Sequence, residues 1–144
     1  MQDQEDIEMK ALSAVADHMS RAIKSVPAET TLQEASRLMA MFNIGSLLVT
    51  KDGQYVGILT DTDLARKGMA KGINPETASV QSLMSSPIIS IESHKTVEEA
   101  HVLMKGKGGE GFRHLVVTES GKIAGIVSLS DLIRYYASNF QMSE

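Results

Sequence analysis

The sequence contains no cysteine in its 144 residues. The protein can therefore form no disulfide, use no thiol in catalysis and hold no zinc through cysteine. It also has no apolar run near the roughly 20 residues that a membrane-spanning helix needs. The first ten residues, MQDQEDIEMK, lack the basic-then-apolar order of a signal peptide. These absences predict a soluble, cytoplasmic protein without a membrane partner.

Positive charge is also scarce, with 14 Lys and Arg against 18 Asp and Glu and a net charge of −4. Phosphate contacts along a nucleic acid need clustered Lys and Arg, so we expect no nucleic-acid partner. Basic side chains gather only in residues 66–71 and 105–114, and patches of this size suit a small anion better than a polyanion. No constellation for general-base or nucleophilic catalysis is present, which predicts a protein that is not an enzyme.

An internal repeat is the main positive feature of the sequence. Residues 19–39 align with residues 84–104, and Met, Ser, Ile, Thr, Glu, Ala and Leu recur in register. Residues 47–66 align with residues 115–134, where Leu, Val, Thr, Gly, Ile, Asp and Arg recur. The second alignment has a larger offset, so the second copy carries extra residues within KGKGGEG (105–111). That segment lacks the spacing of a phosphate-binding loop and is expected to be a mobile loop, which could lie over a cleft as a lid.

Each copy predicts the order β-α-β-β-α. A short strand, around Ile23–Val26 or Ile88–Ile91, precedes a helix that opens with a Thr-x-x-Glu capping box. Two strands then follow, joined by a tight Asp-Gly or Ser-Gly turn. The second of these strands runs into another helix. The capping boxes are Thr31 with Glu34 and Thr96 with Glu99, the turns are Asp52-Gly53 and Ser120-Gly121, and the last helices start at Thr60 and Ser128.

The predicted fold class is α+β, with two such repeats packed face to face about a pseudo-two-fold axis, because one copy alone is small for a stable core. The predicted domains are an N-terminal acidic helix at 1–17, with helical residues from about 3 to 17, a first repeat at 18–70, a linker at 71–81 and a second repeat at 82–144. Tyr135, Tyr136 and Phe140 form an apolar patch that is expected to pack on the other repeat or on a second subunit.

Two matching segments carry a family resemblance: GILTDTD (57–63) and GIVSLSD (125–131). Together with the Met-Ser pairs at 19–20 and 84–85, and with HLVV at 114–117, they make residues 18–138 resemble a tandem pair of cystathionine β-synthase (CBS) domains, also called a Bateman module. The resemblance implies regulatory binding of an adenosine compound such as AMP, ADP, ATP, S-adenosylmethionine or NAD in clefts between the repeats. No further cofactor is implied.

The resemblance also implies roles for particular residues. The Asp of each motif would bind ribose hydroxyls, and the hydroxyl residue would support the ribose or a phosphate. These residues are Thr60 with Asp63, and Ser128 with Asp131.

The motif also makes chemical sense without the family. A glycine permits close approach to the strand backbone, a helix start favours an anion, and a carboxylate can accept bonds from two neighbouring hydroxyls. A purely structural alternative remains open, in which Thr60 and Ser128 are helix N-caps, and Asp63 and Asp131 are acids of the first turn. Such a cap stabilises a helix by ~1 kcal/mol.

Further candidate nucleotide contacts lie beside these motifs. Arg66, Lys67, Arg113 and His114 could reach phosphate, or could be solvated charges. Arg113 and His114 align with the uncharged Gly45 and Ser46 of the first repeat, so the two clefts should differ. An apolar floor for adenine would come from the first strands, where plain core packing is the alternative reading. Its residues are Ile23, Val26, Ile88 and Ile91.

Metal binding has weak support, because His94, Glu98 and His101 match no standard ligand spacing. The expected assembly is a homodimer that stacks two modules into a disc and signals to a regulated partner protein. Two alternatives stay open: an interaction or assembly module with vestigial clefts, and a divalent-cation sensor that uses Asp61, Asp63 and Asp131.

Overall fold

The computed structural model describes residues 13–106 and 111–139, which form two compact units. Residues Ile23–Ile88 make up one, called here the first unit. The described residues before Ile23 and after Ile88 make up the other, called the second unit. Each unit contains the β-α-β-β-α order predicted from its repeat.

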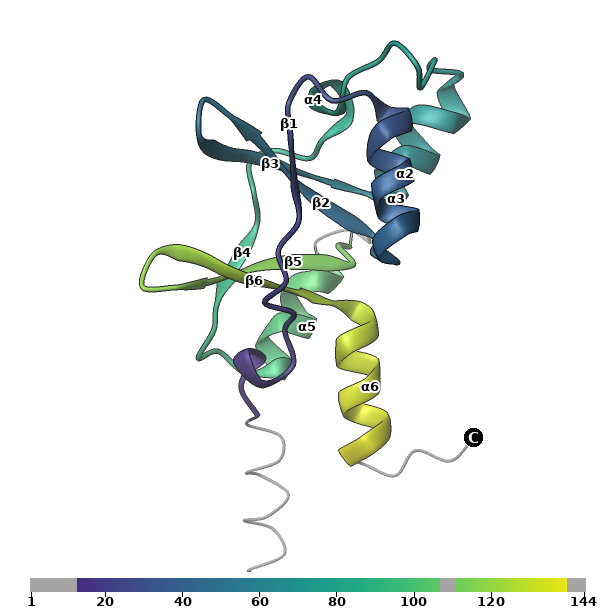
Figure 1. Ribbon diagram of the computed structural model, residues 1–144. Helices are drawn as coiled ribbons and strands as arrows, with labels where there is room; N and C mark the ends of the chain where they lie inside the picture. The colour runs from purple at the N-terminus through teal and green to yellow at the C-terminus, as the bar shows by residue number, and fades with distance from the viewer. Residues whose placement is uncertain (1–12, 107–110, 140–144) are drawn as a thin grey trace, which may run out of the picture. The chain divides into compact units, whose positions relative to one another are not determined.

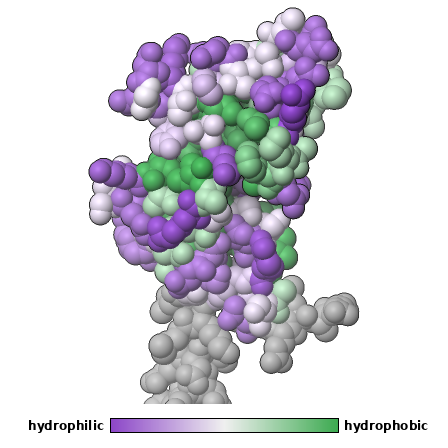
Figure 2. All heavy atoms as spheres, in the orientation of Figure 1, coloured by the Kyte–Doolittle hydropathy of each residue, from purple (hydrophilic) through white to green (hydrophobic). Residues whose placement is uncertain are grey.

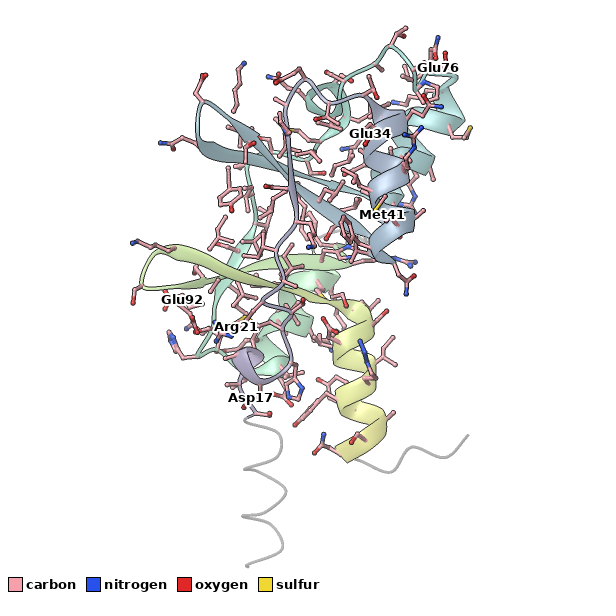
Figure 3. The ribbon with its side chains drawn as sticks, in the orientation of Figure 1. Asp17, Arg21, Glu34, Met41, Glu76 and Glu92 are labelled. Carbon is pink, nitrogen blue, oxygen red and sulfur yellow. The ribbon has the colours of Figure 1, made fainter. Side chains whose placement is uncertain are left out.

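The first unit has a three-stranded sheet in the order β1-β2-β3, with β1 parallel and β3 antiparallel to β2. Figure 1 shows α2 beside this sheet, and Figure 3 places Glu34 near the start of that helix and Met41 near its end. The bounds are β1 Ser25–Pro27, α2 Leu32–Phe42, β2 Ser46–Lys51, β3 Gln54–Thr60, α3 Asp61–Asp63, the π-helical η2 Leu64–Gly68, the 3-10 turn η3 Met69–Lys71 and α4 Val80–Leu83.

Alternation along the strands builds the core of the first unit. Leu47 and Val49 of β2 and Leu59 of β3 point to one side of the sheet, where they meet the apolar face of α2. On the face seen in Figure 2, apolar side chains gather over the sheet and α2, whereas polar side chains cover the tip of the β2–β3 hairpin.

The second unit repeats this plan with the sheet order β4-β5-β6, and α5 and α6 lie side by side next to the hairpin (Figure 1). A short 3-10 turn, η1, belongs to the same core through the fully buried Val15. The bounds are η1 Val15–Asp17, β4 Ser90–Glu92, α5 Val97–Lys105, β5 His114–Glu119, β6 Lys122–Ser128 and α6 Leu129–Asn139.

The segment that precedes each repeat's first strand packs in the other repeat's unit. Residues 14–20 pair with the second repeat through Ala14–Thr96 and Ser20–Ile126 bridges. Residues 79–85 pair with the first repeat through Thr31–Ser79 and Ile58–Ser85 bridges. Arg21 adds two hydrogen bonds to Glu119, of 3.0 and 3.1 Å, beside the β5–β6 hairpin in Figure 3. The boundaries of the compact units therefore differ from those of the predicted repeats at 18–70 and 82–144. The division into those repeats stays a prediction, and so does their face-to-face packing.

The predicted turns and caps appear in both units, with one difference. Asp52-Gly53 and Ser120-Gly121 both have positive φ at each residue, which matches the right-handed twist of a two-residue hairpin. Thr96 and Glu99 form the complete capping box. In the first unit only half of the box forms: Thr31 accepts from the Glu34 N–H, while the Glu34 carboxylate pairs with Arg37 at 3.3 Å.

Several predictions fall wholly or partly outside the described residues. The N-terminal helix expected through residue 17 is described only from residue 13, where the chain forms a bridge and the η1 turn, so the α-helical prediction is wrong for that part. Residues 107–110 of the expected loop and Phe140 of the apolar patch lie outside the description. No helix within residues 13–106 and 111–139 is long and apolar enough to span a bilayer.

Candidate functional site: two strand-to-helix corners

The two predicted ligand motifs each form a corner where the last strand of a hairpin turns into a helix. In the first corner β3 ends at Thr60 and α3 begins at Asp61. In the second corner β6 ends at Ser128 and α6 begins at Leu129. The start of the neighbouring strand lies beside each corner, because Ser46 pairs with Thr60 and His114 pairs with Ser128.

The chain just before the neighbouring strand also holds each corner. The Asp61 N–H donates to the Gly45 carbonyl at 2.9 Å, and the Leu129 N–H donates to the Arg113 carbonyl at 2.7 Å. These aligned bonds place Arg113 and His114 at the second corner, together with Ser128. Both uncharged counterparts, Gly45 and Ser46, lie at the first corner. The sequence-predicted asymmetry in basic residues is therefore present in the structure.

Both aspartates are capping acids, as the structural alternative predicts. Asp63 Oδ2 accepts the Thr60 N–H at 3.0 Å, and the Thr60 hydroxyl accepts the Asp63 N–H at 3.1 Å. Asp131 Oδ2 accepts the Ser128 N–H at 2.8 Å, and the Ser128 hydroxyl accepts the Asp131 N–H at 3.2 Å. Each cap occupies one carboxylate oxygen, so the surroundings of the other oxygen decide what else the group can bind.

In the first corner the carboxylate of Asp63 is enclosed by its own chain. Its side chain is 8% exposed, and Lys67 Nζ lies 2.9 Å from Oδ1. The Ser85 hydroxyl donates to the same carboxylate at 3.3 and 3.4 Å. The Lys67 ammonium also donates to the Leu83 carbonyl at 3.2 Å and to Ser85 Oγ at 3.3 Å. The carboxylate is therefore surrounded by polar groups of its own unit, while the Lys67 side chain is 44% exposed and solvent screens part of its ion pair.

In the second corner the carboxylate of Asp131 is more open. Its side chain is 21% exposed, and its Oδ1 accepts from Arg134 Nη2 at 2.8 Å. The Arg134 side chain is itself 70% exposed, and ion pairs this open are screened and contribute little. Separation of Arg134 from Asp131 would therefore cost little free energy.

One different residue and one different hydrogen bond at aligned positions accompany this contrast. The position that aligns with Lys67 is Tyr135, a core residue only 4% exposed. Burial, and then the nearby Glu98 carboxylate, raises the pKa of its phenol. The residue that aligns with Ser85 is Ser20, whose hydroxyl accepts from the Ala22 N–H at 3.3 Å. At the second corner the lysine is thus replaced by a core tyrosine, and the serine is present but has its side-chain hydrogen bond with Ala22 and not with Asp131.

The helix geometry after the aspartate differs as well. Residues 64–68 are π-helical, and the Met69 N–H reaches both the Leu64 and the Ala65 carbonyls. The matching part of α6 is a regular α-helix. Single π-helical turns inside helices are rare and frequently occur at functional sites.

The glycines of the motifs serve a packing role that the sequence only partly indicated. A Cβ on Gly57 would lie 2.5 Å from Met84 Sδ and 3.0 Å from the Ser85 carbonyl. A Cβ on Gly125 would lie 2.6 Å from the Ser20 carbonyl. The group that approaches each strand is thus a Met-Ser pair. It belongs to the segment that precedes each repeat's first strand, residues 14–20 or 79–85, called here the crossing segment. The repeated pairs in the sequence were the available signal, but only the fold connects them to these glycines.

The remaining predicted residues divide into core and surface. Val26 and Ile91 are buried in the two cores, which fits the plain core reading, whereas Ile23 and Ile88 are only half-buried. Arg66 is exposed and makes no ion pair among the described residues. Sequence reasoning missed Ser85 and Arg134 as partners of the aspartates, although Arg134 recurs in register with Arg66.

A groove of about 610 Å³ lies elsewhere on the second unit, between β4 and α5. Ile91 is the one predicted nucleotide contact among its lining residues, which also include Glu98 and Val102. No group of three or more metal-ligating side chains occurs in residues 13–106 and 111–139.

A family model described as the CBS domain matches residues 15–70 and 80–138, which include both corners. The chain belongs to the CBS domain family. Its two matched stretches make it a tandem CBS pair with an α+β fold, as the sequence resemblance predicted. The family match also covers the crossing segments, since its two stretches begin at Val15 and Val80.

Known CBS proteins resemble the chain over most of its length. It is 33% identical over 128 residues to the CBS domain-containing protein YhcV of Bacillus subtilis, covering 89% of each chain. It spans only 19 to 56% of several longer curated relatives. A solved CBS-domain protein from Burkholderia ambifaria is 28% identical with a TM-score of 0.82, over 91% of this chain and 98% of that one.

A more distant structure shares the fold alone. The CBS pair of protein MJ0100, solved in complex with 5′-methylthioadenosine and S-adenosyl-L-methionine, is 21% identical with a TM-score of 0.75. The comparison covers 88% of this chain and 98% of that one.

Proposed function

We propose that this CBS pair is a regulatory protein, not an enzyme, that binds an adenosine compound and reports its occupancy to a partner protein. The observation that carries the proposal is the open carboxylate of Asp131, with Ser128, Arg113 and His114 at the same corner. The fold alone does not choose a ligand, so the proposal rests on these side chains. The MJ0100 complex supports adenosine compounds as the class to test.

The chemistry of the second corner suits a ribose next to a phosphate. Displacement of Arg134 would leave Asp131 Oδ1 to accept bonds from the ribose hydroxyls, while Oδ2 keeps its cap bond to Ser128. The displaced Arg134 and the exposed Arg113 are then cations available to a phosphate. Binding can signal only if it favours one of two states of the protein, so the partner must distinguish the occupied form.

A homodimer is part of the proposal. Exposed apolar side chains lie on α2 at Met41 and Phe42, on α5 at Val102 and Leu103, and on α6 at Ile133. Helix faces of this kind are suited to packing against a second copy. Light scattering on the samples used below measures the mass directly, and a monomer at micromolar concentration would contradict the dimer.

Thermal shift and calorimetry with AMP, ADP, ATP, S-adenosylmethionine, NAD and Mg²⁺ test the proposal. A ligand at ~100 Kd adds about 2.7 kcal/mol of stability, which raises Tm by several degrees in a protein of this size. Asp131→Ala should lose more of this shift than Asp63→Ala. If no adenosine compound moves the transition, the proposed ligand class is wrong. A response to Mg²⁺ alone would favour the cation sensor.

A further inference from the structure

The polar groups that contact the two aspartate carboxylates differ in number. A carboxylate offers about four lone-pair positions to hydrogen-bond donors. Asp63 accepts hydrogen bonds from the Thr60 N–H and the Ser85 hydroxyl, and its ion-pair partner, the Lys67 ammonium, takes up a third position 2.9 Å from Oδ1. Asp131 accepts two hydrogen bonds, from the Ser128 N–H and Arg134. A ribose brings two hydroxyl donors, so the positions left fall short at Asp63 but suffice at Asp131, where displacement of Arg134 would free a further one.

The ammonium of the lysine at the first corner has three polar neighbours. Lys67 Nζ donates to the Leu83 carbonyl and to Ser85 Oγ and pairs with Asp63 Oδ1, while the lysine side chain as a whole is 44% exposed. Ser85 is fixed in turn, because its backbone exchanges two hydrogen bonds with Ile58 of β3, of 2.8 and 3.1 Å. The lysine is thus held to the same sheet that carries the corner. Its release would leave a buried carboxylate without its counter-charge, which is unfavourable.

We infer that Lys67 closes the first corner from within, so that the protein presents only the second corner to an adenosine ligand. This inference rests on the proposed function and deepens it. It gives Lys67 an internal role as the counter-ion of Asp63 in place of a contact to ligand phosphate. The sequence supports the difference between the corners, because the position that aligns with Lys67 carries the core residue Tyr135.

Removal of the lysine charge should therefore create a second binding site. Lys67→Met keeps the apolar stem and removes the ammonium, so Asp63 regains lone pairs for two hydroxyls. Calorimetry is run with the compound of the panel that binds the wild type most tightly, or with AMP if none does. The wild type should bind one ligand per chain, and Lys67→Met should bind two. Lys71→Met, which changes an exposed lysine of the same unit, is the matched control and should bind one.

Combination with Asp131→Ala assigns the sites. Asp131→Ala alone should bind none, and the double variant Lys67→Met/Asp131→Ala should regain one site at the first corner. Loss of binding in Lys67→Met, or an unchanged single site, would overturn the inference, since the lysine would then contact the ligand or be irrelevant to closure. Two sites in the wild type would overturn it as well.

A measurement without ligand keeps the inference separate from the proposed function. In urea unfolding, Lys67→Met, Asp63→Asn and the double variant form a cycle, and the paired side chains should show a coupling of about fivefold in the unfolding equilibrium constant. Additive effects would contradict the internal pairing, whatever binds. Single-site binding in both the wild type and Lys67→Met would reject closure but leave the proposed function intact. A site only in Lys67→Met would reject the proposed second-corner site but support closure.

Discussion

The two corners share one seven-residue pattern that ends in aspartate, but the surroundings of the two aspartate carboxylates differ. Asp63 is enclosed by Lys67 and Ser85, whereas Asp131 is held by one exposed arginine. The cap bonds are the same in both, so the local pattern determines the turn from strand to helix. The groups that differ come from one helical turn after the aspartate, where Lys67 lies, and from the crossing segment, which contains Ser85. A repeated motif therefore predicts a repeated turn, but not a repeated site.

The largest expected effect tests the close packing that the corners share. Gly125→Ala would place a methyl group 2.6 Å from the Ser20 backbone carbonyl, so we expect a loss of about 3 kcal/mol in the free energy of unfolding. Gly57→Ala meets the flexible Met84 side chain first, at 2.5 Å, and should lose about 2 kcal/mol because that side chain can move.

Urea unfolding of both variants gives the comparison, with Lys122→Ala on the exposed face of β6 as the control. Equal losses at the two glycines would mean that the backbone carbonyl yields as readily as the methionine, and would remove this difference between the repeats.

A smaller effect distinguishes the aspartates themselves. Asp63→Ala removes the acceptor for Thr60 and Ser85 and the ion-pair partner of Lys67 at a buried position, and should lower the free energy of unfolding by about 2 kcal/mol. Asp131→Ala removes chiefly a cap and should lose ~1 kcal/mol. Thermal melts without ligand measure both. A larger loss at Asp131 would show that enclosure adds nothing to the first corner.

The smallest effect concerns the first helices of the two repeats and depends on pH. The Thr96 N–H, bound to the Glu99 carboxylate at 2.9 Å, lowers the pKa of Glu99 below its ordinary value. A lowered folded-state pKa adds stability above the unfolded-state pKa, and this stability disappears as the pH falls through the folded-state value.

Glu99→Ala should therefore be less stable than the wild type at pH 7, and the gap should narrow near pH 3. Glu34 pairs with Arg37 and lacks the return bond to Thr31, so Glu34→Ala is the matched control for loss of a glutamate without that bond. Urea midpoints at the two pH values measure the difference. A gap for Glu99→Ala that stays constant with pH would contradict the assignment.

Much of the fold could be predicted because its signals are local. The hairpin turns needed positive φ at Asp52-Gly53 and Ser120-Gly121, and the residue pairs themselves indicated this. The capping threonines started both first helices as expected. The end of the predicted N-terminal helix was wrong, because Val15 is buried in the second core and Ala14 bridges to Thr96, a contact that no local pattern contains.

The sequence could predict which residues belong to the candidate site, but not which groups contact each aspartate carboxylate. The repeat identified Thr60, Asp63, Ser128 and Asp131, and the aligned Arg113 and Gly45 indicated that the corners differ in charge. Ser85 could not be assigned to Asp63 from the sequence, since it lies 22 residues away and reaches the carboxylate through a bridge to Ile58.

The sequence by itself determined the repeat, the order of elements and the strand-to-helix turns, because these depend on spacing, turn chemistry and capping within a few residues. Only the tertiary structure decided which aspartate is enclosed. The crossing segment brings Ser85 and the Leu83 carbonyl to Lys67 in the first unit, while the core of the second unit takes Tyr135 at the aligned position. Burial and the donors that reach a carboxylate are properties of packed neighbours, and these come from distant parts of the chain.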